Sequence, residues 1–222
     1  MTASVLVTGG TGGLGTAVVA AFAQAGWRVV VPYRSTPPAE TPGVVGVRAD
    51  LTDPAQVAAA VEVAAEDGRL TAVVNLAGGF AMGGRVHETP VEVFEAQFQT
   101  NLRPTYLVCA AAVPHLIAAG GGSIVCVSSR AALHPFAGAA GYVTSKAAVL
   151  ALVDALDAEY RVDGIRVNAV LPGVIDTPAN REAMPGDRAG WVDPADIAKT
   201  ILFLASDASG TVSGARVPVD RA

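Results

Sequence analysis

Ser129, Tyr142 and Lys146 are the residues of this sequence whose types and spacing best suit chemistry. Tyr142 and Lys146 are four residues apart, so on a helix they share a face. Ser129 ends an apolar run from Ser123 that is typical of a buried strand. A tyrosine can deliver a proton to an atom that has accepted a hydride if its pKa is lowered from about 10. A lysine cation at this spacing is expected to lower it.

A glycine-rich segment near the N-terminus supplies the other need of hydride transfer, a cofactor site. It reads Thr8-Gly-Gly-Thr-Gly-Gly-Leu-Gly15 and lies between a predicted strand and a predicted helix. Glycines let backbone N–H groups approach a pyrophosphate, and a helix N-terminus favours its negative charge. The expected contacts are Gly9, Gly13 and Gly15. Taken alone, the pattern is also compatible with an ordinary strand-to-helix turn.

The elements that must position these groups alternate along the chain. Short β-branched runs predict strands at residues 5–8, 28–33, 44–48, 72–75, 123–128, 166–170 and 215–219. Alanine-rich stretches predict helices at residues 14–25, 54–65, 90–119, 141–161 and 194–205. Two of these helices begin with proline after an aspartate, Asp53 and Asp193, which suits a helix N-cap. The alternation predicts an α/β fold in one domain over residues 1–222, with a doubly wound, parallel, seven-stranded sheet and helices on both faces.

Composition excludes several classes of protein. Apolar residues make up 51% of the 222 residues and charged residues 16%, which argues against disorder. No apolar run approaches the roughly 18 residues of a membrane span, and no basic segment precedes the first strand, so a soluble, cytoplasmic protein is expected. A net charge of −5 with scattered basic residues gives no surface for nucleic acid.

The histidines and cysteines show no pattern of metal ligation. His87, His115 and His134 have no ligand spacing with one another or with Cys109 and Cys126. The two cysteines fall in a predicted helix and a predicted buried strand, which suits reduced core thiols. We therefore expect neither a metal site nor a catalytic cysteine.

The order of the motifs resembles that of the short-chain dehydrogenase/reductase family over almost the whole chain. The glycine loop has that family's Thr-Gly-x-x-x-Gly-x-Gly spacing and is followed by Asp50, Asn75-Leu-Ala-Gly78 and Asn101. Ser129, Tyr142-x-x-x-Lys146 and Pro172-Gly-Val-Ile-Asp-Thr177 complete the set. Leu76 stands where the family usually has a second asparagine. The resemblance implies a Rossmann-fold oxidoreductase that depends on NAD(P)(H).

The resemblance also implies roles for single residues. The catalytic residues would be Asn101, Ser129, Tyr142 and Lys146. Ser129 would hold and polarise the substrate oxygen, and Tyr142 would act as general acid and base. Asn101 would hold a helix irregularity and a water that links Lys146 to solvent; a kink is consistent with Pro104. Ser128 is an alternative serine, but the family's spacing to the tyrosine selects Ser129.

The implied cofactor contacts extend over several segments. Asp50 and Leu51 would border the adenine, residues 75–78 would support the ribose side, and residues 172–177 would hold the nicotinamide carboxamide. The full set is Gly9, Thr11, Gly12, Gly13, Leu14, Gly15, Arg34, Asp50, Leu51, Asn75, Ala77, Gly78, Tyr142, Lys146, Pro172, Gly173, Ile175 and Thr177.

The end of the second predicted strand bears on the choice of cofactor. An acidic residue there would bind a free ribose 2′-hydroxyl, whereas an arginine would attract a 2′-phosphate. This chain has Tyr33 at that position, followed by Arg34, and no carboxylate before Glu40. NADP(H) is therefore favoured, and NAD(H) stays possible.

The substrate is less defined by the sequence. We expect a small carbonyl or alcohol compound, so that the reaction interconverts C=O and CH–OH. Residues 77–83 and 176–185 resemble segments of dihydropteridine reductases, which makes reduction of a quinonoid dihydropterin the second hypothesis. Reduction of a 3-oxoacyl thioester is the third. A non-catalytic NAD(P)-binding sensor is the alternative of another class, because fold alone does not imply turnover.

The predicted helix at residues 141–161 indicates self-association. Its apolar residues form a surface that is broader than the single face needed to pack against the sheet. Members of the family pair through this helix, so a homo-oligomer, either a dimer or a tetramer, is expected.

Overall fold

The computed structural model describes residues 3–66 and 70–221 and contains one parallel seven-stranded sheet. The strand order is β3-β2-β1-β4-β5-β6-β7, and each neighbouring pair is parallel. The strands are β1 (Ser4–Thr8), β2 (Arg28–Tyr33), β3 (Val44–Arg48), β4 (Leu70–Asn75), β5 (Gly122–Val127), β6 (Ile165–Pro172) and β7 (Arg216–Val219). The predicted fold class is therefore confirmed.

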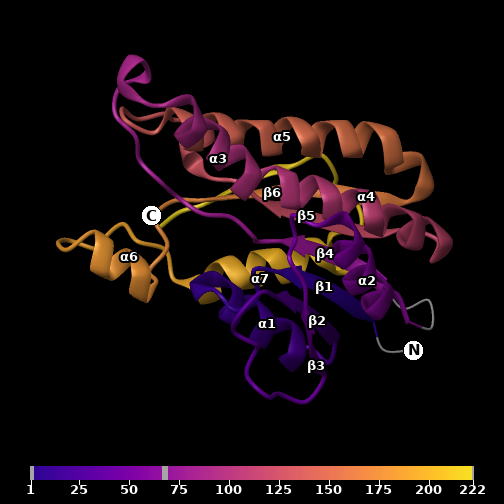
Figure 1. Cartoon of the computed structure of the whole chain (residues 1–222). Coiled ribbons are helices and arrows are strands. Elements are labelled where there is room, and N and C mark those ends of the chain that lie inside the picture. Colours follow the sequence, from indigo (N-terminus) through magenta and orange to yellow (C-terminus); the bar gives the residue numbers. More distant parts are fainter. Residues whose placement is uncertain (1–2, 67–69, 222) are drawn as a thin grey trace.

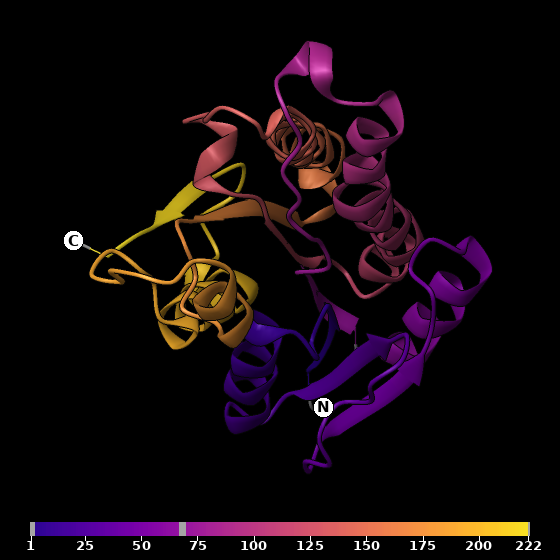
Figure 2. The same cartoon turned by 60° about the vertical axis from the view of Figure 1, so that its left-hand side comes forward.

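Seven α-helices connect and cover these strands (Figure 1). They are α1 (Gly13–Gln24), α2 (Pro54–Ala65), α3 (Val91–Asn101), α4 (Arg103–Ala118), α5 (Ala140–Tyr160), α6 (Pro178–Ala183) and α7 (Pro194–Ala205). Figures 1 and 2 show α3, α4 and α5 packed together on one side of the sheet, whereas α1 and α7 lie on the other.

The core consists of two apolar layers separated by the sheet. Adjacent residues of a strand point to opposite faces, so Leu6 packs in the layer of α2, α4 and α5, whereas Val5 and Val7 pack in the layer of α1 and α7. Central strands must therefore be apolar on both faces, and all five residues of β1 are buried. Two buried faces fix the register of the strands and hence the positions of their carboxyl ends.

Both predicted aspartate caps are present. The Asp53 carboxylate accepts from the backbone N–H of Ala55 at 2.9 Å, and the Asp193 carboxylate accepts from Ala195 N–H at 2.8 Å. Because proline at the first helical position has no N–H to satisfy, these caps begin α2 and α7 at the predicted residues.

The predicted helix at residues 90–119 is wrong as a single element, because the structure divides it into α3 and α4 at Leu102. Pro104 lacks an N–H to donate to the carbonyl of Thr100, and its ring would collide with that carbonyl in a continuous helix. The short helix α6 was not predicted; it begins at Pro178, after an N-cap by Thr177.

The carboxyl ends of the strands form one edge of the sheet, on the left in Figure 1. At this edge, the chain leaves β1 toward β2 on one side, whereas it leaves the neighbouring strand β4 toward β5 on the other side. Such a switch point is where open parallel sheets bind ligands. Within residues 3–66 and 70–221, no helix combines the length and apolar character of a membrane span.

Candidate active site

The glycine loop packs closely against the end of β4. Gly9 has φ of +66°, and a Cβ on it would lie 2.9 Å from the backbone nitrogen of Ala77. A Cβ on Gly15 would lie 2.0 Å from the carbonyl oxygen of Gly9, so α1 can begin here only with glycine. The Thr8 hydroxyl, which was not predicted as a site residue, accepts from Leu76 N–H and Ala77 N–H, both at 3.2 Å.

The same loop also meets the segment that follows β6. A Cβ on Gly13 would lie 2.7 Å from Cγ2 of Thr177, whose Oγ1 accepts from Asn180 N–H at 3.2 Å. Residues distant in sequence thus form opposite walls at the switch point. A loop of glycines with N–H groups at a helix start fits the pyrophosphate of a nicotinamide dinucleotide.

A cavity of about 500 Å³ opens at this edge and contains most of the predicted reaction centre. Ser129, Tyr142 and Lys146 all line it, although they come from the end of β5 and from α5. The Ser129 hydroxyl accepts from Ala131 N–H at 3.1 Å, which fixes its position after the strand. A proton donor and a second hydroxyl therefore face one space.

Tyr142 is half-buried, and its surroundings act on its pKa in two directions. Burial raises the pKa of the phenol, and the hydrogen bond with Ser129 lowers it by a smaller amount. The sequence predicted that Lys146 would lower the pKa of Tyr142. In the structure the pKa of Tyr142 is instead raised. The physical reason is desolvation of the phenolate, which exceeds the favourable contact. Phe80 contributes to this burial, since its ring packs edge-on against Tyr142 with 4.9 Å between centroids.

Lys146 is buried, with 6% of its surface exposed. Its Nζ donates to the carbonyl oxygen of Val127 at 3.1 Å. Burial lowers the pKa of Lys146 to about 8, and the nearby Cys126 opposes that shift. At neutral pH the ammonium is still mostly charged, beside the cavity wall.

Asn101 lies at the end of α3, where the helix breaks, and its side chain is fully engaged. Its Oδ1 accepts from Gly79 N–H at 2.9 Å, and its Nδ2 donates to Ser145 Oγ at 3.1 Å. Ser145 Oγ in turn donates to the carbonyl oxygen of Tyr142 at 2.8 Å. Asn101 thereby connects the segment after β4 with the second turn of α5.

The structure brings most predicted cofactor residues together and distinguishes the two candidate serines. Both serines line the cavity, but Ser128 is buried and its hydroxyl donates to the carbonyl oxygen of Lys146 at 2.8 Å, whereas Ser129 is the serine that acts on the pKa of Tyr142. The predicted residues that line the cavity are Leu14, Gly78, Ser129, Tyr142, Lys146, Pro172, Gly173 and Ile175. Gly9, Gly13, Gly15, Ala77 and Thr177 form the adjoining contacts described above, and Thr11 and Gly12 are exposed on the same loop.

Asn75 does not face the cavity, contrary to its predicted contact with the cofactor. Its side chain is 3% exposed, and its amide nitrogen donates to Cys109 Sγ at 3.4 Å and Cys126 Sγ at 3.7 Å. As the last residue of β4, it points into the core, because side chains alternate between faces. Its position is structural, beneath the site.

Three predicted cofactor residues lie outside the cavity, after the ends of β2 and β3. Arg34 is exposed just after β2. Asp50 accepts from the N–H of Thr52 at 2.9 Å, and this hydrogen bond, with a smaller contribution from Arg34, lowers the pKa of its carboxyl. Leu51 is partly buried against the core.

Sequence reasoning missed other residues of the site. Ser145 precedes Lys146, and that adjacency was the only signal available for it. Phe80 and Arg130 line the cavity, but nothing in their sequence context indicated that they do.

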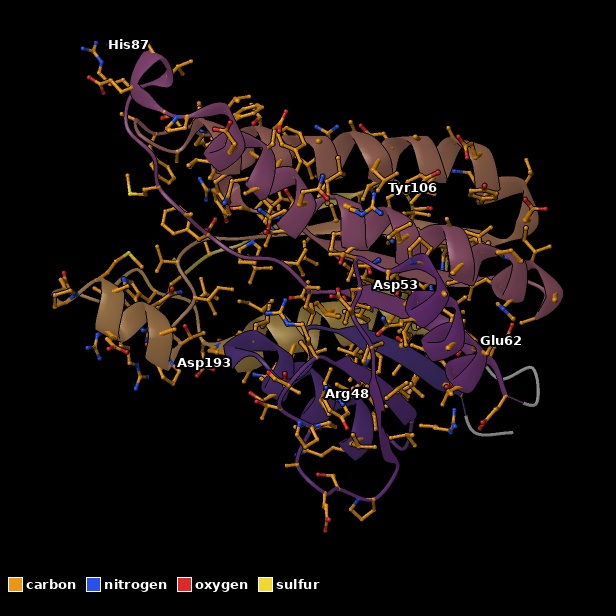
Figure 3. All side chains as sticks on the ribbon, viewed as in Figure 1. Arg48, Asp53, Glu62, His87, Tyr106 and Asp193 are labelled. Carbon is orange, nitrogen blue, oxygen red and sulfur yellow. The ribbon has the colours of Figure 1, made fainter. Side chains whose placement is uncertain are left out.

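His87, which Figure 3 labels, points away from the molecule at an exposed tip. In the described part of the chain, no three His, Cys, Asp or Glu residues gather as a metal site would require.

Comparison with known proteins agrees with this geometry. The family model described as short chain dehydrogenase matches residues 3–188. The 2-(R)-hydroxypropyl-CoM dehydrogenase of Xanthobacter autotrophicus is 34% identical over 98% of this chain and 96% of its own.

Two solved structures are also similar. ElxO with NADP bound has a TM-score of 0.91 and 27% identity, covering 99% of this chain and 97% of its own. The 3-ketoacyl-(acyl-carrier-protein) reductase from Brucella melitensis, complexed with NADH, has a TM-score of 0.88 and 29% identity, covering 98% and 96%. The chain therefore belongs to the short-chain dehydrogenase family of nicotinamide-dependent oxidoreductases.

Proposed function

We propose that this protein interconverts a carbonyl compound and its alcohol with NADP(H) as the favoured cofactor, and that Tyr142 moves the proton. The observation that carries the proposal is that Ser129, Tyr142 and Lys146 line one cavity, in which Ser129 is near enough to Tyr142 to lower the pKa of its phenol. A phenol and a second hydroxyl facing one space are what a substrate oxygen needs when it gains or loses a proton.

Each residue has a distinct task in this reaction. The bound nicotinamide supplies or accepts the hydride. Ser129 donates a hydrogen bond to the substrate oxygen and holds it near the phenol. In reduction, Tyr142 gives its proton to that oxygen, and in oxidation the phenolate removes it. The Lys146 ammonium stabilises the phenolate and holds the ribose hydroxyls, and Asn101 holds the first turn of α5 in place through Ser145.

The cofactor would lie along the carboxyl edge of the sheet, from Arg34 to Ile175. Backbone N–H groups at Gly13 and Leu14 would bind the pyrophosphate, and Thr177 would contact the nicotinamide side. Arg34 would bind a 2′-phosphate, because its guanidinium is exposed beside the end of β2 and Tyr33 offers no carboxylate. The remaining contacts would be those proposed from the sequence, except that Asn75 would support the site from the core.

The substrate class is inferred from the cavity and supported by a relative. The name of the Xanthobacter dehydrogenase specifies a 2-hydroxypropyl group, which is a secondary alcohol. We therefore place ketones and secondary alcohols ahead of thioesters. A 3-oxoacyl thioester, the third hypothesis from the sequence, becomes the second candidate ahead of the dihydropterin because of the likeness to the Brucella reductase.

The test measures oxidation of NADPH and NADH with a panel of ketones and a quinonoid dihydropterin. Tyr142→Phe is expected to abolish turnover while leaving cofactor binding intact, because only the proton donor is lost. Tyr160→Phe, a change at the far end of the same helix, is the matched control and is expected to retain turnover. Equal turnover by Tyr142→Phe would overturn the mechanism. Cofactor binding without turnover of any compound would favour the alternative hypothesis, a non-catalytic NAD(P)-binding sensor.

We also propose a homo-oligomer formed through α4 and α5. Phe98, Leu102, Tyr106 and Leu152 line a second hollow between these helices and α3. Tyr106 is 56% exposed. Figure 3 labels its side chain on α4. Light scattering tests this assembly, and a monomer at micromolar concentration would contradict it.

A further inference from the structure

Arg130 places a cation on the wall of the cavity, one residue beyond Ser129. It begins a short 3-10 helix (Arg130–Ala132) that Ser129 caps, so its backbone is fixed by the same hydrogen bond that fixes the serine. Its side chain is 42% exposed, and His134 lines the cavity on the same side. No aspartate or glutamate is among the described residues that line the cavity. This wall therefore favours an anion over a cation.

Asp220 anchors the Arg130 guanidinium from outside the cavity. The Asp220 carboxylate forms an ion pair with Nη1 of Arg130, and a Cβ on Gly173 would lie 2.9 Å from Asp220 Oδ1. Asp220 does not itself line the cavity. Within the described chain, no hydrogen bond engages Nε or Nη2 of Arg130. One edge of the guanidinium is thus anchored, while its remaining donors stay available for a second oxyanion.

The side chains near Tyr142 suit a flat apolar group. The Phe80 ring packs edge-on against Tyr142, and its centroid lies 6.3 Å from that of Phe136. Phe80, Phe136 and Met184 are 56%, 47% and 41% exposed, so all three present apolar surface at the mouth of the cavity. Aromatic and thioether groups pack well against a planar ring.

We propose that the substrate carries a carboxylate or another oxyanion that Arg130 binds, and that Phe80 and Phe136 hold its flat apolar body. Arg130 is then a specificity-determining residue, and Asp220 is a positioning residue that orients it. This inference rests on the proposed function, because it assumes that the reacting oxygen lies between Ser129 and Tyr142. It adds the chemical class of the substrate.

The experiment compares two aromatic keto acids with their methyl esters. The two acids are phenylglyoxylate and 4-acetylbenzoate, and each is paired with its methyl ester. The distance from carboxylate to ketone differs between the two acids. Calorimetry measures their binding to the protein alone and to the protein saturated with NADP⁺, which cannot reduce a ketone, and NADPH oxidation measures turnover. Arg130→Gln removes the cation. Arg85→Gln removes an exposed arginine that does not line the cavity and is the matched control.

We expect one acid to bind about tenfold more tightly than its ester, because a guanidinium–carboxylate hydrogen bond is stronger than a neutral one. Arg130→Gln should reduce this preference to about threefold or less, and Arg85→Gln should keep it. Unchanged NADPH affinity would show that Arg130→Gln still folds. The inference is overturned if neither acid is preferred, or if the preference survives in Arg130→Gln. Preferential binding without turnover would support the anion site and contradict the proposed reaction.

Discussion

The amide nitrogen of Asn101 donates to the hydroxyl of Ser145 at 3.1 Å, and this hydrogen bond joins the end of α3 to the second turn of α5. Asn101 is 1% exposed and Ser145 is fully buried. Because Ser145 also donates to the carbonyl oxygen of Tyr142, it connects the helix break with the proton donor. A buried pair of this kind is costly to break from one side.

Ser145→Ala is therefore expected to lower the free energy of unfolding by about 1–3 kcal/mol, since it leaves the Asn101 amide without its acceptor. It should lower kcat about tenfold with a smaller change in KM, because Tyr142 loses its positioning contact. Chemical denaturation and steady-state kinetics measure the two effects. Thr144→Ala, on the exposed side of the same turn, is the control. An unchanged kcat in Ser145→Ala would contradict a positioning role.

Gly13→Ala is expected to weaken cofactor binding at least tenfold. The new Cβ would lie 2.7 Å from Cγ2 of Thr177, so the two walls of the groove must separate. The double change with Thr177→Gly removes both carbons that the new Cβ would meet, Cγ2 at 2.7 Å and Cβ at 2.8 Å, and should restore part of the affinity. Fluorescence titration with NADPH measures all three proteins. If the second change restores nothing, the contact between these residues is not the cause of the loss.

Lys146→Met is expected to abolish turnover and yet to stabilise the chain. The fall of the lysine pKa from 10.5 to about 8 corresponds to a cost of about 3 kcal/mol at neutral pH. The hydrogen bond to Val127 offsets part of this cost, so the expected gain in unfolding free energy is about 1–2 kcal/mol.

The pH dependence of that gain follows from the direction of the shift. Between pH 8 and 10.5 the unfolded chain binds more protons than the folded one, so the stability of the unchanged protein rises with pH over this interval. The gain from Lys146→Met should be full below pH 8 and vanish towards pH 10.5. Urea denaturation at pH 7 and pH 10 tests this, and equal gains at both values would contradict it.

Arg34→Glu is expected to shift the cofactor preference from NADPH towards NADH by about 100-fold in the ratio of kcat/KM values, since it replaces an attraction for the 2′-phosphate with a repulsion. The same charge change at Arg85, which is exposed outside the groove, is the control. An equal change of the ratio in both variants would indicate a general charge effect. If kcat/KM of the unchanged protein is lower with NADPH than with NADH, the proposed preference for NADP(H) is wrong.

The sequence alone determined the parallel sheet and the pairing of Tyr142 with Lys146, because these follow from local patterns. Apolar runs predict buried strands, and residues four apart on a helix share a face. The caps by Asp53 and Asp193 were equally local. The predicted helix 90–119 was wrong because a proline permits either a kink or a break, and the packing of α3 and α4 decides which.

Only the tertiary structure decided which side chains share the cavity and how their surroundings shift their pKa values. The pKa of Tyr142 rises through burial that no sequence spacing encodes, and Asn75 points into the core because of the pleat at the end of β4. Arg130 and Asp220 are distant in sequence and meet because β5 and β7 end at the same edge of the sheet. Desolvation and long-range contact depend on the packed chain as a whole, so they are properties of the fold.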